Sequence, residues 1–330
     1  MPHLSASIGL DIGHSTVKIA CCTNDKKEHK LIFPSVAMPA FSISDDVEAK
    51  RAARETVAVQ GNDYFYGDTA LMQGGNASGL SENWIDSPEH EALLRGALDK
   101  VAKLGAAEPT MLVVGLPSKF FSRQRERLGA IISAIFPGEV KVVPQPFGPY
   151  QALMLDNHGN PSGQHSMGAE SWGVVEIGYF TTDFMLMEKG RFKQQVFDSC
   201  AGIRVAAEHL ARLMSEESIN ADLTECDEAI KKRVMQNFGK QLDVSKQVDI
   251  AVKTIAGEIA DTASRLMEPY ARKLTGVLVA GGGAHLVMPH IATKWPHAVM
   301  AEDPRFSVAE GMRRFGMGIL RSRELQLVEA

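Results

Sequence analysis

Long apolar runs are missing from this sequence of 330 residues. Its longest strongly apolar stretches are strand-sized, and none approaches the roughly 18 residues of a membrane-spanning helix. The first seven residues hold no charged segment followed by an apolar one, so we expect no signal peptide. The net charge is only −5 and creates no strong attraction to DNA or anionic lipid. We therefore expect a cytoplasmic protein that binds neither membranes nor nucleic acid directly.

Cysteine is also scarce, and metal-site spacings are absent. The four cysteines form no CxxC pair, and the ten histidines show no HxxxH or HExxH spacing. These absences argue against the usual zinc sites, and we interpret the cysteines as reduced, buried thiols. A Walker A loop and a Rossmann GxGxxG are missing as well.

The composition that remains is that of an ordinary globular protein, with 45% hydrophobic and 23% charged residues. Apolar strands alternate with helical periodicity in both halves, which predicts two α/β domains with mixed sheets covered by helices. The segments expected to be helical are 88–104, 202–214, 248–274, the stretch from 308 onward, and a long polar section that ends near 239. A polar, glycine-rich segment at 157–171 is the expected connection between the domains.

Two segments, 165 positions apart, follow one template. Residues 11–18 read Asp-Ile-Gly-His-Ser-Thr-Val-Lys, and residues 176–183 read Glu-Ile-Gly-Tyr-Phe-Thr-Thr-Asp. Each has a carboxylate first, glycine third, threonine sixth and a charge eighth, between apolar runs. This pattern predicts two strand–turn–strand hairpins. The turns could hold phosphate oxygens through N–H groups and hydroxyls, although each alone could be an ordinary polar hairpin.

Specific roles follow for the side chains of the two turns. In the first turn, Asp11 would hold a Mg²⁺-bound water, and Lys18 would reach a β- or γ-phosphate. Glu176 would share the metal with Asp11, through water, because neighbouring carboxylates favour a cation between them. The remaining candidates for contact with a nucleotide in the two turns are Gly13, His14, Ser15, Thr16, Gly178, Tyr179 and Thr181.

Two further elements complete the candidate site. An apolar strand at 276–280 runs into Gly281, Gly282 and Gly283, where backbone without side chains leaves room for a flat group. The alternative is a tight strand-to-helix turn. Gln145 lies between two prolines before a helix and could orient an attacking water, or it could be a loop glutamine without a role.

Taken in order, these elements resemble the actin–Hsp70–sugar kinase ATPase superfamily and, within it, the ParM/StbA plasmid-segregation actins. The segments that carry the resemblance are 8–13 (Ile-Gly-Leu-Asp-Ile-Gly), 33–35 (Phe-Pro-Ser), 66–68 (Tyr-Gly-Asp), 113–117 (Val-Val-Gly-Leu-Pro), 143–145 (Val-Pro-Gln), 176–183, 280–284 (Ala-Gly-Gly-Gly-Ala) and 309–312 (Ala-Glu-Gly-Met). The resemblance implies an actin-like, duplicated ribonuclease H-like α/β fold with two domains around a central nucleotide cleft. The domains would be residues 1–157, with a surface insertion at about 34–85 and a completing helix at 308–330, and residues 158–307.

The resemblance also implies a function. ATP or GTP with Mg²⁺ would drive assembly of the chain with itself into filaments, and hydrolysis would disassemble them. Asp11, Gln145 and Glu176 would be the catalytic residues, Gly281–Gly283 would lie behind the adenosine, and Gly202 would lie near the nucleotide. The filaments would separate plasmid copies through a DNA-bound adaptor protein, which agrees with the net charge of −5.

The sequence departs from the family pattern in the second turn. Glu176 stands where the family has Asp, and its extra methylene moves the carboxylate by roughly 1 Å, which is enough to slow hydrolysis. Tyr179 and Phe180 replace small residues. Two alternatives therefore stay open. One is a nucleotide switch of the same fold that does not polymerise, and the other is a small-molecule kinase.

Overall fold

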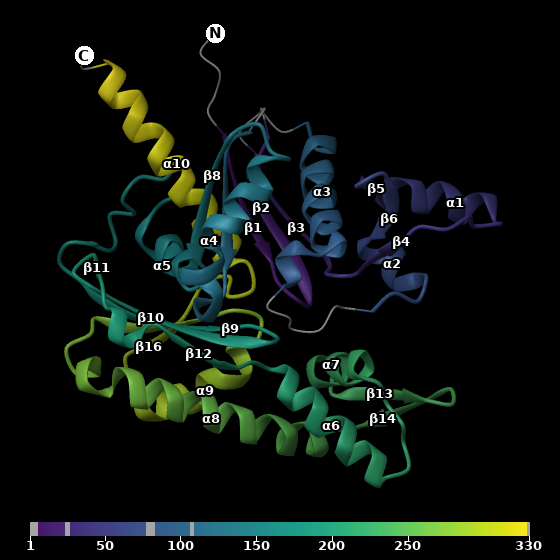
Figure 1. Cartoon of the computed structure of the whole chain (residues 1–330). Helices are drawn as coiled ribbons and strands as arrows, with labels where there is room; N and C mark the ends of the chain where they lie inside the picture. Colours follow the sequence, from purple (N-terminus) through teal and green to yellow (C-terminus); the bar gives the residue numbers. More distant parts are fainter. Residues whose placement is uncertain (1–5, 24–26, 77–82, 106–108, 329–330) are drawn as a thin grey trace. The chain divides into compact units, whose positions relative to one another are not determined.

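A computed structural model of the chain describes residues 6–23, 27–76, 83–105 and 109–328 (Figure 1). The chain divides into two compact units, Met1–Ser166 with Phe306–Ala330, and Met167–Arg305. The break between residues 166 and 167 falls inside the polar segment 157–171. The last helix returns to the first unit after the whole of the second has been completed.

The first unit is built on a five-stranded sheet in the order β3-β2-β1-β7-β8. Strand β1 pairs antiparallel with β2 and parallel with β7. The bounds of the strands are β1 Ala6–Ile12, β2 Thr16–Cys22, β3 Glu28–Pro34, β7 Pro109–Leu116 and β8 Glu139–Pro144. The predicted hairpin at 11–18 is thus present. The buried apolar strand β1 leads into a tight turn, and β2 runs back antiparallel beside it.

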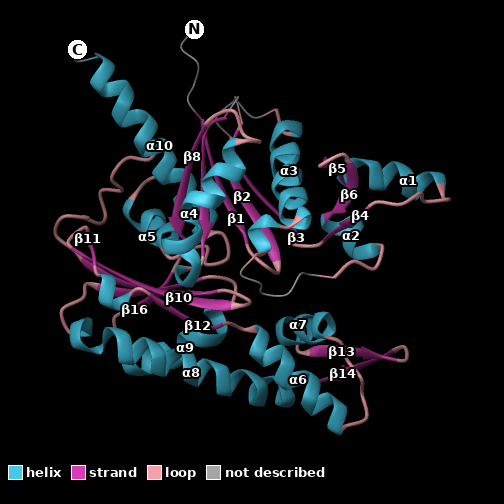
Figure 2. Cartoon of the chain, viewed as in Figure 1, coloured by secondary structure: helices cyan, strands magenta, loops and turns pink. Residues whose placement is uncertain are grey.

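Helices cover both faces of this sheet, as Figure 2 shows. Alternation along β7 sends Leu112 and Val114 into a core with helices α3 and α4, and Met111 and Val113 into a core with α5 and α10. The helices are α3 Pro88–Lys103, α4 Ser118–Ser133, α5 Phe147–Met154 and α10 Ser307–Val328. Ser87 accepts a hydrogen bond from the His90 N–H at the start of α3, and Pro88 is the first residue of that helix.

A small subdomain is inserted between β3 and α3. It contains a three-stranded sheet in the order β4-β6-β5 and two short helices. Their bounds are β4 Ala37–Pro39, α1 Asp46–Ala52, β5 Thr56–Val59, β6 Asn62–Tyr66 and α2 Gly67–Met72. Two 3₁₀ turns accompany them, at Ala53–Glu55 and Trp84–Asp86.

The second unit repeats the scheme of the first. Its sheet has the order β11-β10-β9-β15-β16, with β12 on β10. Strand β9 pairs antiparallel with β10 and parallel with β15, as β1 does with β2 and β7. The strands are β9 Ser171–Ile177, β10 Thr181–Glu188, β11 Arg191–Phe192, β12 Asp198–Ala201, β15 Gly276–Ala280 and β16 Ala298–Met300, with a 3₁₀ turn at Gln194–Val196. The repeated template therefore lies at the same topological position in both units.

Four helices and a second hairpin complete this unit. The helices are α6 Arg204–Glu216, α7 Leu223–Lys232, α8 Ser245–Ala271 and α9 Ala284–Lys294. The prediction of helical structure up to residue 239 is wrong. Helix α7 ends at Lys232, and its C-cap Arg233 has a φ of 63°. Strands β13 Val234–Asn237 and β14 Lys240–Asp243 follow as a hairpin. A left-handed residue ends a helix because its carbonyl no longer points along the helix axis.

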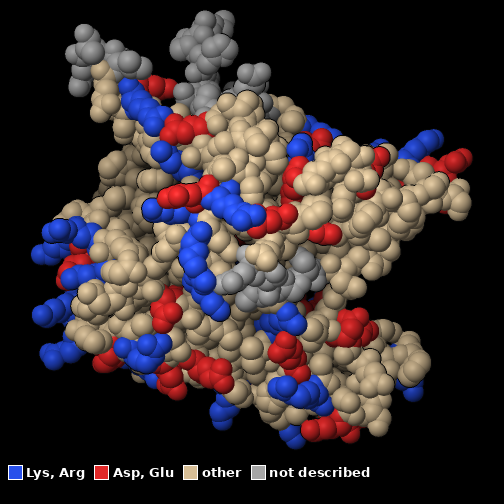
Figure 3. All heavy atoms as spheres, viewed as in Figure 1, with Lys and Arg blue, Asp and Glu red and all other residues tan. Residues whose placement is uncertain are grey.

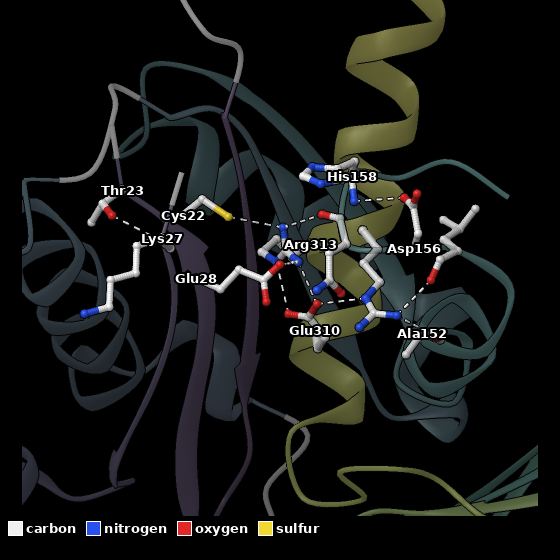
Figure 4. Close-up of polar contacts among 12 residues, drawn as sticks. Cys22, Thr23, Lys27, Glu28, Ala152, Asp156, His158, Glu310 and Arg313 are labelled. Atoms are coloured by element: carbon white, nitrogen blue, oxygen red, sulfur yellow. Dashed lines mark hydrogen bonds and ion pairs between the residues drawn. The ribbon is translucent and has the colours of Figure 1, made fainter. Parts of the chain in front are cut away.

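Helix α10 is fixed to the first unit by a buried ion network (Figure 4). Arg313 is 1% exposed, and its guanidinium donates to Glu310, to the carbonyl of Asn157 and to Cys22 Sγ. Burial alone would raise the pKa of Glu310, but the hydrogen bonds and positive charges of Arg313 and Arg314 together outweigh that effect and lower the pKa. The four cysteines are free thiols, and Cys21 and Cys226 are buried as expected, whereas Cys22 and Cys200 are partly exposed. Acidic and basic side chains are scattered over the face in Figure 3, most of which is formed by other residues, and basic ones gather beside β11 at its left edge.

Candidate functional site

The first turn brings a carboxylate and an ammonium group together at the end of β1. Asp11 is 3% exposed and lies opposite Lys18 in the β1–β2 register. Lys18 Nζ donates to Asp11 Oδ2 at 2.9 Å. Directly opposed residues of an antiparallel pair share one face of the sheet, so the spacing of the template is what forms this ion pair.

Gln145 joins the same carboxylate from a distant part of the sequence. Its side-chain Nε2 donates to Asp11 Oδ1 at 2.9 Å, and its main-chain N–H donates to the carbonyl of Leu116 at 2.8 Å. The second bond extends the β7–β8 ladder past Pro144 and fixes where the side chain starts. Three predicted site residues, Asp11, Lys18 and Gln145, therefore form one buried cluster.

Gly13 leaves this cluster open on one side. A Cβ at Gly13 would lie 3.8 Å from Lys18 Nζ and 3.9 Å from Asp11 Oδ1, and only 3.1 Å from the carbonyl oxygen of Thr16. Any side chain would thus fill the approach to both charged groups. Ser15 and Thr16 are partly exposed at the rim of the turn.

Ser35 supports the turn and was missed as a functional residue. It is buried, its hydroxyl donates to the carbonyl of Gly13, and its N–H donates to the carbonyl of Ser15 at 3.0 Å. The sequence signal was a serine directly after the strand that pairs with β2. These two hydrogen bonds from Ser35 fix the conformation of the first turn.

His14 turns its ring toward Trp84. The two rings stack with centroids 4.0 Å apart and planes 27° apart, and Trp84 in turn meets His90 edge-on at 4.8 Å. Burial lowers the pKa of His14 to about 4, against a small opposing effect of Asp11. A cavity of about 20 Å³ adjoins the three rings. The neutral imidazole is thus part of an aromatic stack, and its contact with a ligand stays a prediction.

The second turn repeats the geometry with a different pair. Glu176 ends β9 and lies opposite Asp183 in the register, and both are buried. Where the first hairpin has an ion pair, the second therefore places two carboxylates on neighbouring strands. Asp183 accepts hydrogen bonds from Thr181 Oγ1 at 2.8 Å and from Ser199 Oγ at 2.6 Å. The proton of the Thr181 hydroxyl is thus directed to Asp183, and the oxygen keeps a lone pair that can accept.

The start of helix α6 holds the second turn from the other side. The N–H groups of Gly202, Ile203 and Arg204 donate to the carbonyls of Phe180, Gly178 and Tyr179 at 2.8–3.1 Å. A Cβ at Gly202 would lie 2.6 Å from two of these carbonyl oxygens. Close backbone approach therefore explains the glycine at position 202, where the sequence suggested contact with a nucleotide.

The two aromatic residues of the turn also have structural partners. The Arg204 guanidinium lies 4.7 Å from the centre of the Phe180 ring, and the Tyr179 and Phe180 rings meet edge-on at 5.3 Å. Burial raises the pKa of Tyr179 to about 12. These aromatics are thus used in docking the turn onto α6.

The glycine turn after β15 touches the same carboxylate. Gly281 has φ +89°, and a Cβ there would lie 2.5 Å from Glu176 Oε1 and 2.3 Å from the Ile177 carbonyl oxygen. A Cβ at Gly283 would meet the side chains of Ile177 and Ile203 at 2.4 Å. Only Gly282 has open space around its backbone. Protein packing therefore requires the first and third glycines, and the middle one is accessible.

The described residues contain no group of three or more His, Cys, Asp or Glu side chains that could hold a metal ion by itself. Each unit brings predicted site residues together in a cluster: Asp11, Lys18 and Gln145 in the first unit, and Glu176 with Asp183 beside Gly281 in the second. Both lie at the carboxyl end of a central strand, where α/β sheets commonly bind ligands.

Comparison with known protein families fits this duplicated geometry. Residues 9–148 match the actin-like proteins N-terminal domain, and residues 174–293 match the C-terminal domain of the MreB-like archaeal actin homologues. The chain is an actin-like protein. Together the two matches span both hairpins and Gly281–Gly283. None of the curated proteins matches this sequence.

Solved structures share the fold across nearly the whole of this actin-like chain. A 15-stranded ParM filament from Clostridium botulinum has 19% identity and a TM-score of 0.74, covering 94% of this chain and 99% of its own. The archaeal actin homologue Ta0583, in complex with ADP, has 17% identity and a TM-score of 0.70, covering 96% and 99%. ParM of Bacillus thuringiensis with ATP has 12% identity and a TM-score of 0.63, covering 97% and 99%. The fold is thus the actin-like fold that the sequence predicts. Within the described residues no helix is long and apolar enough to cross a membrane.

Proposed function

We propose that this protein binds ATP or GTP with Mg²⁺, assembles into filaments in the nucleotide-bound state, and disassembles after hydrolysis. The cargo we propose is plasmid DNA, attached through a DNA-bound adaptor protein. The observation that carries the proposal is the buried contact of Gln145 and Lys18 with Asp11, at the end of β1 in an actin-like fold.

The side chains of the first cluster suit a phosphate group and its cation. The ammonium of Lys18 uses one N–H on Asp11 and keeps two for phosphate oxygens. Each Asp11 oxygen accepts one hydrogen bond and retains a lone pair. Gly13 leaves the approach to both groups free of a side chain. Mg²⁺ held beside Asp11 through water would neutralise charge on the phosphates.

Gln145 is the residue we assign to the attacking water. Its amide N–H₂ is directed to Asp11, which fixes the opposite end of the amide, the carbonyl oxygen, as an acceptor. That oxygen can accept a hydrogen bond from a water and orient it. An amide is not a base at neutral pH, so its contribution is positioning.

The second cluster supports a matching role for Glu176. Its carboxylate lies beside Gly178 and Gly281, so it adjoins both the turn and the accessible backbone of Gly282. We propose that Glu176 shares the water shell of the metal and that Gly282 is the point of the glycine turn nearest the nucleoside. Self-assembly and plasmid cargo rest on the likeness of the fold to a ParM filament.

One observation favours the alternative of a nucleotide switch that does not polymerise. Thr181 directs its hydroxyl proton to Asp183, and aromatic side chains fill the flank of the second turn. Phosphate would then receive fewer donors from this turn than from the first, and hydrolysis would be slow.

Right-angle light scattering with parallel measurement of phosphate release tests the proposal. Purified protein is titrated with Mg²⁺ and ATP, GTP or a non-hydrolysable analogue. We expect scattering above a critical concentration only with nucleotide, and a decay that follows phosphate release. A flat trace with nucleotide demonstrably bound would reject filament formation and favour the switch.

A further inference from the structure

The β13–β14 hairpin of the second unit presents an unusual residue at its tip. Asn237 and Lys240 are Cα partners, so Phe238 and Gly239 form a two-residue turn. Their φ values are 45° and 80°, as a type I′ hairpin turn requires. The hairpin is held firmly, because Met235 is buried in the core of this unit and Leu242 packs against the same core.

Phe238 is disfavoured at this position in two independent ways. Positive φ is rare for a bulky residue, and such turns prefer Asn, Asp or Gly. Its relative exposure is also 102%, the largest among the exposed large hydrophobic residues. Neither packing within the chain nor the backbone favours phenylalanine here. Backbone strain of this kind is typical of functional positions.

We propose that the hairpin tip, Phe238 with Lys240, is a docking knob that binds a second copy of this chain at the edge strand β16. This inference rests on the proposed self-assembly and names the contact that produces it. Aromatic anchors surrounded by polar residues are the typical energetic centre of protein interfaces.

The β16 edge has the complementary character. It is an outer strand of its sheet, and Val299 and Met300 on it are 40% and 37% exposed. Exposed Glu302 lies two positions after Met300. The knob thus carries an apolar residue, Phe238, near the cation Lys240. The β16 edge, which we call the seat, carries the apolar residues Val299 and Met300 near the anion Glu302. No ion pair joins Lys240 or Glu302 to another described residue, so both charges are available.

The two surfaces lie at opposite ends of the second unit. Figure 1 shows the β13–β14 tip projecting from one end and β16 near the other. A chain with a knob at one end and its seat at the other makes heterologous contacts, which build open filaments when the rotation does not close a ring. The geometry therefore favours a second copy as the partner.

Phe238→Asn is the sharpest test, because it removes the knob and relieves the strain together. We expect the critical concentration measured by light scattering to rise at least about tenfold, while the melting temperature of the unassembled protein stays equal or rises. Phe238→Tyr keeps the aromatic ring and should assemble as the unmodified chain does. Phe192→Asn removes an exposed phenylalanine from β11 and should leave the critical concentration unchanged.

The outcomes separate this inference from the proposed function. If the unmodified chain assembles with nucleotide and Phe238→Asn assembles equally well, the knob is wrong and the filament stands. If the unmodified chain associates regardless of nucleotide and Phe238→Asn abolishes that association, the knob stands and the nucleotide dependence fails. If the unmodified chain never associates, both are rejected.

A charge exchange tests the seat. Lys240→Glu and Glu302→Lys should each raise the critical concentration about threefold at low salt, within the range of exposed charge pairs. The double variant should recover most of this loss, because it restores an opposite pair between neighbouring copies. Losses that simply add in the double variant would overturn β16 as the partner surface.

Discussion

Single residues at equivalent template positions create different electrostatic surroundings in the two units. The eighth residue is Lys18 in the first hairpin and Asp183 in the second, each opposite the carboxylate at position one. Lys18 neutralises Asp11 and keeps donors for phosphate. Asp183 instead takes hydroxyl donors from Thr181 and Ser199. The duplicated backbone thus carries two distinct chemistries.

Gln145→Ala should separate hydrolysis from binding. Removal of the amide leaves Asp11 paired with Lys18, so nucleotide affinity should change by no more than a few-fold. Phosphate release should fall about one hundredfold, because the attacking water loses its positioning partner. Nucleotide affinity and single-turnover phosphate release are measured on the same preparation. An unchanged release rate would assign the water to another residue.

His90 makes the stability of the first unit depend on pH. Burial lowers its pKa to about 4, with His14 adding to the effect. Between pH 6.5 and 4 the unfolded chain therefore binds a proton that the folded chain does not, and stability falls as pH falls. His90→Phe should reduce that slope by up to about 1.4 kcal/mol per pH unit, read from urea unfolding at several pH values.

The surroundings of His90 make this prediction specific. Among the described residues, His14 and His90 are the titratable side chains that line the adjoining cavity. An unchanged slope in His90→Phe would show that His90 is protonated in the folded state. His158→Phe, at an exposed position of a surface loop, is the control and should leave the slope unchanged.

The sequence predicted much of the candidate site at this scale. Asp11 and Lys18 meet because the predicted hairpin places them opposite each other. Gln145 reaches Asp11 through the strand order β1-β7-β8, which the motifs do not specify. Their chemical roles stay predictions. The packing reasons for Gly202, Gly281 and Gly283 could not be predicted, since each depends on contacts with the second turn or the strand that enters it.

Among the elements, helix α10 is the one whose packing depends most on glycine residues. Its Gly311 meets Gly148 of α5, and its Ala309 meets Gly9 of β1. A Cβ at Gly311 would lie 1.7 Å from the Gly148 carbonyl oxygen. The helix therefore lies nearly backbone to backbone against its neighbours, close to both Asp11 and the start of α5.

Gly311→Ala should destabilise the first unit by at least about 2 kcal/mol, because backbone, unlike a flexible side chain, cannot move aside. Gly257→Ala in helix α8 is the matched control. No atom lies within 4 Å of its added Cβ, so it should stabilise by about 0.5–1 kcal/mol. The melting temperature should fall for Gly311→Ala and rise for Gly257→Ala. Shifts of the same sign would contradict the close backbone packing of α10.

The elements were predicted well where apolar periodicity is strong and poorly where it is weak. Helix α3, strand β15 and helix α10 lie close to their expected bounds. The sequence predicts helix where the β13–β14 hairpin lies, because the two strands are short and polar and lack a strand-like apolar alternation. Its turn carries phenylalanine in place of the Asn-Gly that usually marks one. The residue that obscured the hairpin is the one we assign to docking.

At the scale of the whole molecule, the chain folds as two units with separate hydrophobic cores. Among the described residues, one large core is formed within residues 175–298, and the other cores belong to the first unit. The first unit is discontinuous in sequence, because α10 returns to it after residue 305. Arg313, in the first half of α10, therefore stabilises a unit whose residues outside the segment 306–330 lie more than 140 positions earlier.

Arg313→Met should loosen the first unit and leave the second unchanged. Removal of the guanidinium leaves Glu310 buried with Arg314 as its remaining ion-pair partner, at a cost of about 3 kcal/mol. Hydrogen exchange followed by mass spectrometry resolves the units by peptide. Peptides from β1 and α10 should exchange up to about one hundredfold faster, whereas those from α8 and β15 should keep their rates.

Arg321→Met, at an exposed position of the same helix, is the control and should alter the exchange rates of neither unit. Equal acceleration in both units would mean that they unfold as one, because only a shared cooperative transition carries a local loss from one core to the other.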